Sequence, residues 1–518
     1  MSRWTAALIV LALLAAPASL AAQALPNVNL TRVLYNTRKA TVRPEGDLKA
    51  QIDAVDAAIA EATKLGHTGE VRRQIAKGLT LLDGRAWTPA LDYRTSLVLR
   101  SERTVVDSSR PYAVRLEQIY LPATTLSPAL SVAVRLKKRA PGMPAVAAVA
   151  ASWTVVRELG TFDGLSRDLR ESPFAIDLAL DGVADDAYAV EAEVRDAGAP
   201  LGTTMLPVVL LRGLDQRLDA LAKAAATVPA AERDDVGYPA DYIRSVNRGA
   251  VGLGTFNVAA ELTAAEAIVA AAKGGKDPFA GRTGDFERHY RLDGANEVMP
   301  YRVYVPTSYR PGKATPLVIA LHGLGATEDS FFDSYQQLTP KLADQHGFLL
   351  AAPLGYRIDG FYGSPLMGAG DAASKRRTEY SEQDVLQVLA RMKTAYAVDA
   401  SRIYLIGHSM GAIGTWALGA KYPDIWAALV PFSGVGATAT ASRMKAIPQF
   451  VVHGDADPTV NVSGSRTMVA ALKAAGATVT YIEVPGGNHT DVVVPNLPAA
   501  FAFLAAQKKP PAAATQQQ

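Results

Sequence analysis

The sequence predicts an α/β fold for the C-terminal half of the chain, preceded by helical segments and a small antiparallel β-sandwich. From about residue 285 onward, continuous apolar runs alternate with helical stretches, as expected when strands are buried on both faces of a parallel sheet. Between about residues 91 and 212, apolar and polar residues alternate, which is the period of strands with one buried face. Apolar residues on either side of this region recur at helical spacing.

The length and composition indicate a large globular protein. The 518 residues favour two or three domains. With 49% hydrophobic and 20% charged residues, the chain can bury sizeable cores. The net charge of +3 is spread along the chain, so no basic patch indicates a nucleic-acid partner. The sequence contains no cysteine, which excludes disulfides and a thiol nucleophile.

Residues 1–24 have the order of a secretory signal peptide. Arg3 precedes an apolar run at 6–16, and small residues with Ala-x-Ala spacing follow at Ala22 and Ala24. The run is too short to span a bilayer comfortably, although an uncleaved anchor is the alternative. We therefore expect a secreted or periplasmic bacterial protein with no stable membrane insertion after signal cleavage.

Two helical segments flank the predicted sandwich. Ile52, Val55 and Ile59 fall on one face of a helix, and the second segment ends in KGGKDPFAGRTG (273–284), whose glycines and proline indicate a boundary. The predicted organisation is a signal peptide at 1–24, a helical segment at 25–90, a β-sandwich-like domain at 91–212, a helical segment and linker at 213–281, an α/β catalytic domain at 282–507 and a disordered tail at 508–518.

The sandwich prediction depends on three alternating stretches. They are LSVAVRLK (130–137), FAIDLALDG (174–182) and YAVEAEVRD (188–196). The second ends in Asp-Gly, a strong turn pair. The region is close to the length of an immunoglobulin-like module, so an immunoglobulin-like sandwich is expected.

The parallel sheet is predicted from apolar runs that are bounded by turn residues. They are PLVIALHG (316–323), GFLLAAP (347–353), SRIYLIG (401–407), AALVPFS (427–433), IPQFVVHG (447–454) and ATVTYIEV (477–484). Helical stretches such as SEQDVLQVLARMKTAY (381–396) lie between them. This alternation predicts a doubly wound α/β domain.

The stretch LIGHSMGAIG (405–414) places a serine between two glycines where a strand turns into a helix. Gly-x-Ser-x-Gly is a weak signal by itself, but here Gly407 ends an apolar strand and a helical pattern follows. Such a sharp turn lifts the hydroxyl of Ser409 clear of the sheet. The glycines are needed because side chains there would collide with the neighbouring strand or helix.

A serine nucleophile needs a base, and the place of each histidine in the predicted fold indicates which of them could serve. His489 lies in a Gly-rich loop, VPGGNHTD, after the last strand. His322 and His453 each begin a His-Gly pair that closes a strand, where a structural role is expected. The ring of His408 should point away from the serine on a tight turn. No close spacing of metal-ligating residues occurs, so no metal site is predicted.

A carboxylate must orient the histidine and stabilise its charged form. The stretch HGDADPTV (453–460) lies between the serine and the histidine in the chain and offers Asp455 and Asp457. Asp457 is favoured because the proline after it would fix the loop, and Asp455 is the alternative.

Two backbone amides are expected to form an oxyanion hole. Met410 follows the serine at a helix start, where free N–H groups point outward. The Gly-rich turn LHGLGA (321–326) should supply the second donor, the amide of Leu324.

A long loop, residues 354–380, follows the second of the apolar runs. It holds Tyr356, Phe361 and Tyr362 among many glycines. Because functional loops lie at the strand ends of such sheets, these side chains are predicted to form an open, aromatic-edged substrate groove beside Ser409. The alternative is a surface loop that packs its own aromatic side chains.

Together, LHGLGA, the stretch from Tyr380 to Asp424, HGDADPTV and GGNHTDV resemble the α/β-hydrolase serine esterases. The similarity is greatest to the secreted feruloyl and acetylxylan esterases and polyhydroxyalkanoate depolymerases, with the phospholipase/carboxylesterase group nearby. It covers about residues 285–506. The resemblance implies Ser409 as nucleophile, His489 as base, Asp457 as acid, and the amides of Leu324 and Met410 as oxyanion hole. One departure is Ala412, where many relatives have a second glycine, and it would narrow the pocket slightly.

The sequence therefore predicts a secreted serine carboxylic ester hydrolase that acts by two-step acyl transfer without a cofactor. Its partner would be a small-molecule or polymeric ester with short-chain or aromatic acyl groups, including feruloylated plant polysaccharides and polyesters. One alternative is a prolyl-oligopeptidase-type peptidase, although residues 25–280 show no propeller repeats. A second alternative is a binding protein on a hydrolase scaffold, which would be expected to have a broken triad.

Overall fold

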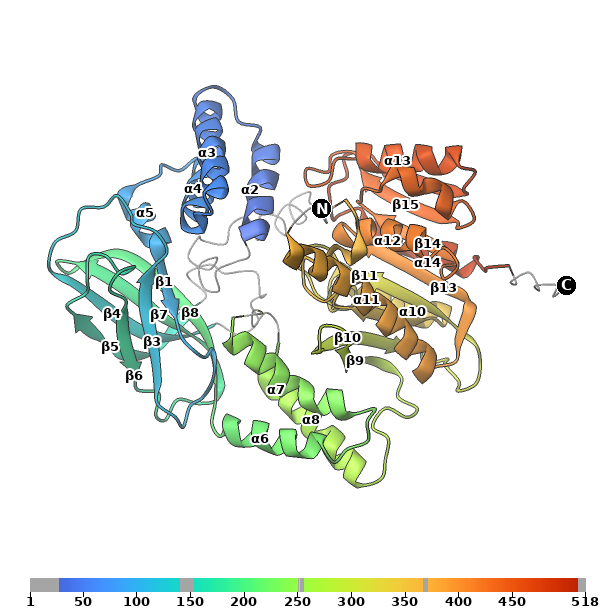
Figure 1. Ribbon diagram of the computed structural model, residues 1–518, viewed down its shortest axis with the longest axis horizontal. Coiled ribbons are helices and arrows are strands. Elements are labelled where there is room, and N and C mark those ends of the chain that lie inside the picture. Colours follow the sequence, from blue (N-terminus) through green and yellow to red (C-terminus); the bar gives the residue numbers. More distant parts are fainter. Residues whose placement is uncertain (1–27, 140–152, 250, 252–255, 367–370, 511–518) are drawn as a thin grey trace, which may run out of the picture. The chain divides into compact units, whose positions relative to one another are not determined.

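The structure, a computed structural model, describes residues 28–139, 153–249, 251, 256–366 and 371–510 (Figure 1). The predicted signal peptide and the last residues of the predicted tail, 511–518, lie outside these ranges. The chain divides into two compact units. Unit 1 comprises Met1–Thr227 and Pro239–Val269, and unit 2 comprises Val228–Tyr238 and Ala270–Gln518. Within the described residues, none of the helices combines the length and the apolar character that crossing a bilayer requires.

Unit 1 begins with helices that pack on one another. They are α2 (Val28–Val42), α3 (Gly46–Lys64), α4 (Thr68–Leu82) and α5 (Pro89–Ser96). Ile52 and Val55 of α3 face Val71 and Ile75 of α4 in one buried core. The predicted N-terminal helices are therefore confirmed, because their apolar residues recur at the spacing of one helix face.

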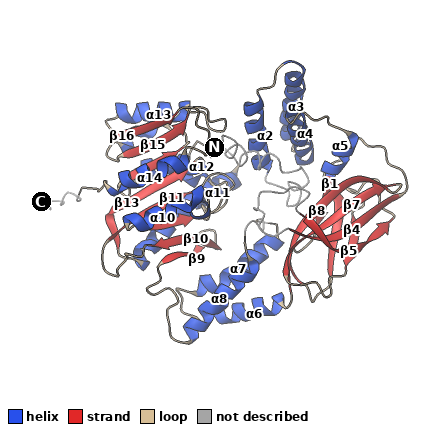
Figure 2. Cartoon of the chain, turned by 180° about the vertical axis from the view of Figure 1, so that it is seen from behind, coloured by secondary structure: helices blue, strands red, loops and turns tan. Residues whose placement is uncertain are grey.

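Two sheets follow in unit 1 (Figure 2). The smaller has the strand order β1 (Leu97–Arg100), β3 (Tyr112–Gln118), β6 (Phe174–Leu178), and the larger has the order β2 (Val105–Asp107), β8 (Ala199–Leu211), β7 (Asp186–Asp196), β4 (Leu130–Arg139), β5 (Trp153–Asp163). Apart from the parallel pair β2–β8, neighbouring strands run antiparallel. Val114 of the smaller sheet and Val132 of the larger belong to the same buried core. The predicted antiparallel strands are confirmed, whereas their immunoglobulin-like identity stays a prediction.

Helices connect the sheets of unit 1 to unit 2. They are α6 (Leu214–Ala225), α7 (Arg233–Asn247) and α8 (Val258–Lys273). The chain passes from one unit to the other after Thr227, between α6 and α7, then within α7 and again within α8. All three points lie inside the segment 213–281, which the sequence predicts to be a helical segment and linker.

Unit 2 is built on a single mixed sheet. Its strand order is β16 (Val479–Val484), β15 (Gln449–Gly454), β14 (Ala428–Phe432), β13 (Val398–His408), β11 (Thr315–Leu321), β12 (Leu349–Pro353), β10 (Glu297–Val305), β9 (Gly284–Leu292). The strands from β16 to β12 run parallel, and β10 and β9 continue the sheet in antiparallel pairing. The predicted parallel sheet is therefore present.

Helices cover both faces of this sheet. One face packs against α9 (Ser330–Asp333), α10 (Leu338–His346) and α14 (Val493–Ala505), and the other against α11 (Ala372–Ala395), α12 (Met410–Lys421) and α13 (Ser463–Ala474). Short 3₁₀ turns complete the connections at η2 (Tyr335–Gln337), η3 (Phe361–Gly363) and η4 (Thr438–Met444). Along β11, Leu317 and Ile319 enter one core, whereas Val318 and Ala320 enter the other. Burial on both faces explains why this strand reads as an unbroken apolar run.

The carboxyl ends of the parallel strands meet at one edge of the sheet. His408 at the end of β13 pairs with Phe432 at the end of β14, and Gly454 at the end of β15 pairs with Val484. Ligands bind in open α/β sheets outside these strand ends, so this edge is where a site is expected.

Candidate active site

Ser409 occupies the turn between β13 and α12. Its backbone has φ 57° and ψ −116°, a conformation that non-glycine residues adopt only under constraint. The Ser409 amide donates a hydrogen bond of 2.9 Å to the carbonyl of Phe432, which anchors the turn to the neighbouring strand. The strained turn presents a half-exposed serine at the edge of the sheet.

The two glycines around the serine are required by close backbone contacts. A Cβ atom on Gly411 would lie 1.9 Å from the carbonyl oxygen of Leu321 in β11. One on Gly407 would lie 2.2 Å from the carbonyl oxygen of Gly411 in α12. Helix and strand therefore approach each other more closely than any side chain at these positions would allow.

The turn after β11 lies against the serine. A Cβ atom on Gly323 would be 3.4 Å from the serine Cβ. The amide of Gly325 is occupied by the carbonyl of Ile358 at 2.8 Å. In contrast, no acceptor among the described residues takes the amide of Leu324 or of Met410. These two donors remain available for an oxygen bound beside the serine.

The acid and the histidine meet at the ends of β15 and β16. Nδ1 of His489 lies 2.7 Å from Oδ2 of Asp457. Asp455 does not share this contact, because its Oδ1 accepts the amide of Gly486 at 2.6 Å. Of the two aspartates that the sequence left open, the geometry pairs Asp457 with the histidine.

Asp457 is surrounded by hydrogen-bond donors. Its Oδ1 accepts the amides of Thr459 at 2.8 Å and Val460 at 2.9 Å. Its Oδ2 accepts from Nε2 of His453 at 3.1 Å as well as from His489. Burial would raise the pKa of Asp457, but the bonds from the two histidines outweigh it and hold the pKa well below its usual range. The side chain is therefore a carboxylate at neutral pH.

The turn that carries Asp457 and the loop that carries His489 touch through their backbones. The amide of Ala456 donates to the carbonyl of Gly487 at 3.0 Å. A Cβ atom on Gly454 would lie 2.1 Å from the same carbonyl oxygen. A glycine is needed here because the two segments lie in direct backbone contact.

His408 holds the histidine loop from the other side. Its Nε2 donates to the carbonyl of His489 at 2.8 Å, and the two rings lie 4.9 Å apart. Burial is the larger cause and the nearby His489 the smaller one, and together they lower the pKa of His408 to about 3. The ring is therefore neutral and has one N–H. Its Nδ1 therefore accepts from the hydroxyl of Tyr335 at 2.9 Å.

The reactive atoms of the candidate triad are the hydroxyl oxygen of Ser409 and Nε2 of His489. Within the described ranges, neither the hydroxyl of Ser409 nor Nε2 of His489 has a hydrogen-bond partner. Such contacts often tighten only when a substrate is bound. Both groups are partly exposed at the sheet edge and can reach a ligand there.

Tyr362 corrects the predicted substrate groove. Its ring is fully buried, and its hydroxyl donates to the carbonyl of His322 at 3.2 Å. Its amide donates to Oγ of Ser381, and its ring lies so close to Gly414 that a Cβ atom there would be 2.6 Å away. The prediction that Tyr362 edges an open groove is wrong, because this ring fills the core beneath the turn that bears Leu324.

The other two aromatic residues of the loop are half-buried. The hydroxyl of Tyr356 donates to Glu297 at 3.1 Å, and Arg357 stacks on its ring at 4.0 Å. Its amide donates to the buried Asp384 at 2.8 Å. Phe361 packs against the edge of the core. A substrate contact for Tyr356 or Phe361 stays a prediction.

Sequence reasoning missed the residues that support the triad. It expected a structural role for His453 and, for His408, only a ring that points away from the serine, whereas both contact the residues proposed as base and acid. Tyr335 carries no local signal at all, because its partner His408 lies 73 positions away in the chain. The closeness of His453 to Asp457 in sequence was the one available hint.

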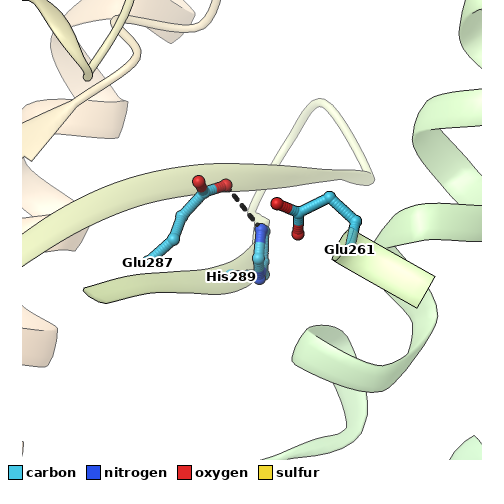
Figure 3. Close-up of side chains that lie close together, drawn as sticks. All are labelled: Glu261, Glu287 and His289. Carbon is cyan, nitrogen blue, oxygen red and sulfur yellow. Dashed lines mark hydrogen bonds and ion pairs between the residues drawn. The ribbon is translucent and has the colours of Figure 1, made fainter. Parts of the chain in front are cut away.

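A group of acidic residues elsewhere in unit 2 could be taken for a metal site. Ligand atoms of Glu287, Glu328 and Asp329 lie within 4.8 Å of one another. However, Glu287 accepts Nε2 of His289 at 2.8 Å (Figure 3), and Asp329 accepts from Arg302 at 2.7 Å. Burial alone would lower the pKa of His289, but two neighbouring carboxylates raise it to about 9. Burial raises the pKa of Glu328. Glu287 and Asp329 are therefore held in ionic contacts, whereas Oε2 of Glu328 is buried with no hydrogen-bond partner among the described residues.

Comparisons with known proteins identify the family of the C-terminal domain. Residues 308–506 match the Phospholipase/Carboxylesterase family. A bifunctional acetylxylan esterase/xylanase from Neocallimastix patriciarum is 29% identical over 31% of this chain and 21% of its own length. Feruloyl esterase B from Neurospora crassa is 33% identical over 28% of this chain and 47% of its own length. Poly(3-hydroxyalkanoate) depolymerase C from Paucimonas lemoignei is 29% identical over 23% and 28%, respectively.

The C-terminal half of the chain therefore carries an α/β-hydrolase domain of the phospholipase/carboxylesterase type. It is distantly related to feruloyl and acetylxylan esterases and to a polyhydroxyalkanoate depolymerase, as the sequence motifs predicted. The chain spans less than half the length of each of these relatives.

Proposed function

We propose that the protein is a serine carboxylic ester hydrolase in which Ser409 is the nucleophile, His489 the general base and Asp457 the acid. The observation that carries this proposal is the 2.7 Å hydrogen bond between His489 and Asp457, at the sheet edge where the strained turn presents Ser409. An ionised carboxylate on Nδ1 fixes the tautomer that leaves Nε2 free to accept a proton. No cofactor is needed for this chemistry.

In the proposed mechanism, the hydroxyl oxygen of Ser409 attacks the ester carbonyl while Nε2 of His489 takes the hydroxyl proton. The amides of Leu324 and Met410 donate to the oxygen that becomes negative. His489 then returns the proton to the leaving alcohol, which breaks the ester bond and leaves an acylated serine. Water, activated by the same histidine, releases the acid and restores the enzyme.

For the substrate, we propose esters with short-chain or aromatic acyl groups on a small molecule or a polymer. The names of the relatives support this range, since they include feruloyl and acetylxylan esterases and a polyester depolymerase. Export to the periplasm or the medium would suit a polymeric substrate, and the signal-peptide pattern of residues 1–24 supports export.

The proposal is tested by Ser409→Ala. We expect the variant to lose roughly a thousandfold or more of its kcat on p-nitrophenyl butyrate and to lose labelling by a fluorophosphonate probe. Its melting temperature should stay that of the wild type, because the hydroxyl contributes no hydrogen bond to the described fold. Activity within tenfold of the wild type would show that another residue is the nucleophile.

A panel of matched esters and amides separates the esterase from a peptidase of the same fold. We expect hydrolysis of the esters at rates far above those of the amides. Faster cleavage of proline-containing peptide amides would instead support the peptidase alternative.

A further inference from the structure

His453 is a second histidine on the proposed triad acid. It lies next to the last residue of β15, four positions before Asp457 in the chain, and its ring is fully buried. Nε2 lies 3.1 Å from Oδ2 of Asp457 and 2.9 Å from the carbonyl of Val460. Nδ1 lies 2.7 Å from Oγ of Ser465 in α13, and that Oγ lies 3.0 Å from the carbonyl of Gly434.

The proton on Nε2 of His453 follows from these contacts. A carboxylate and a carbonyl oxygen are both acceptors without a hydrogen, so the nitrogen that faces them must carry the proton. Ser465 can either donate to Nδ1 or accept from it while it donates to Gly434. Both arrangements keep the proton on Nε2, where Asp457 and the carbonyl of Val460 share it.

The carboxylate of Asp457 is thereby fully occupied. A carboxylate offers about four lone-pair positions. Two backbone amides fill those of Oδ1, and two imidazole N–H groups fill those of Oδ2. We propose that His453 is a positioning residue, which fixes the plane of the Asp457 carboxylate and shares its Oδ2 with His489.

This proposal rests on the proposed function, and it has a consequence for the pH dependence. Because Oδ2 is divided between two donors, Asp457 stabilises the charged form of His489 less than an undivided carboxylate would. Removal of the N–H of His453 should therefore favour the protonated base. The acid limb of the kcat/KM profile would then move to higher pH.

The other charged groups near His453 do not interfere with this test. Glu483 is its strand neighbour on β16, and the bond from Arg466 keeps the pKa of Glu483 low, at about 2. Asp455 is held by a backbone amide, and the ring of His408 is neutral. Glu483 and His408 therefore keep their ionisation between pH 5 and 8, and neither contributes to a shift in that window.

The experiment compares His453→Leu with His453→Gln, using p-nitrophenyl butyrate between pH 5 and 9. For the leucine variant we expect kcat to fall roughly tenfold with KM within about twofold, because His453 does not face the substrate. The midpoint of its acid limb should rise by about half a pH unit. The glutamine amide can donate to Asp457 as the imidazole does, so both kcat and the midpoint of the acid limb should return toward the wild-type values.

Ser465→Ala provides a variant with a smaller perturbation. It keeps the ring of His453 but removes the partner of Nδ1, and we expect a kcat loss of a few-fold with a smaller upward shift of the midpoint. If His453→Leu fails to fold, this variant decides the question. His67→Gln, at a histidine in unit 1, is the matched control and should leave both kcat and the profile unchanged.

The proposal is overturned if the leucine and Ser465→Ala variants lose activity with no change in the midpoint, since that is what a structural role alone would give. It is also overturned if glutamine behaves as leucine does. Failure of the proposed function has a different signature, which is wild-type hydrolysis that survives Ser409→Ala.

Discussion

Two buried carboxylates in unit 2 have opposite ionisation behaviour. Asp384 in α11 is fully buried and accepts the hydroxyl of Tyr290 at 2.5 Å and the amide of Tyr356 at 2.8 Å. Burial outweighs these bonds and raises its pKa to about 6. Asp457 also has a buried side chain, yet its pKa is held below its usual range.

The difference lies in the donors that each carboxylate receives. Asp384 accepts from a phenol and from backbone amides, which carry no charge. Asp457 accepts from two imidazoles in addition to two amides. Imidazole donors that can carry charge favour the ionised form far more than neutral donors do. Burial therefore does not decide ionisation by itself, and only Asp457 is prepared to stabilise a positively charged base.

The largest expected effect separates the two carboxylates by function. Asp457→Asn should lower kcat on p-nitrophenyl butyrate by roughly a thousandfold or more, because the histidine loses its orienting charge. Asp384→Asn should change kcat by less than about tenfold, since this residue anchors a loop and does not contact His489.

Asp455→Asn is the matched control for this prediction. Among the described residues its carboxylate accepts a backbone amide alone, so kcat should stay near the wild-type value. A larger loss for Asp455→Asn than for Asp457→Asn would transfer the acid role to Asp455.

The second prediction concerns stability and pH. The raised pKa of Asp384 means that its stabilising contribution is complete below the unfolded value of about 4, where both states bind the proton. This contribution to the free energy of unfolding falls as the pH rises to about 6, by an amount on the order of 3 kcal/mol. Above that pH it is constant. The free energy of unfolding of the wild type relative to Asp384→Asn should therefore decrease between pH 4 and 6 in urea titrations.

Asp457 should give the opposite slope. Its folded pKa is lowered, so its contribution is present above the unfolded value of about 4 and is lost as pH falls below it. The difference between the wild type and Asp457→Asn should thus shrink only in acid. Equal slopes for the two aspartates would remove the contrast on which the comparison depends.

The smallest effect is expected in the loop that Asp384 anchors. Tyr362→Phe removes a buried hydroxyl that donates to the carbonyl of His322, and it should destabilise the fold by about 1 kcal/mol. Because this carbonyl belongs to the turn that bears Leu324, kcat should also fall by a few-fold. Thermal melts and initial rates measure both quantities.

Tyr380→Phe is the matched control. Its hydroxyl also donates to a backbone carbonyl, that of Gly294, but at an exposed position where water replaces the lost bond. Neither stability nor rate should change measurably. Equal losses in the two variants would indicate that burial of Tyr362 is not what matters.

The features that the sequence determined are local ones. The alternation of Leu130 and Val132 predicted a strand, and the apolar run before Gly407 predicted a buried one, because side-chain period follows backbone geometry over a few residues. The glycines around Ser409 predicted a close backbone approach, and Leu321 and Gly411 supply it. An α/β domain and its candidate serine could be derived in this way, since each depends on adjacent residues.

Only the tertiary structure decided how distant residues meet. The proline after Asp457 favoured this residue over Asp455 as the acid, but the contact itself depends on two loops that fold against each other, which directs Asp457 to His489 and Asp455 to Gly486. The aromatic ring of Tyr362 could have faced solvent or core with the same sequence signal, and its packing against α12 buried it. Hydrogen bonds and burial depend on which segments the sheet order brings side by side, so no local period could reveal them.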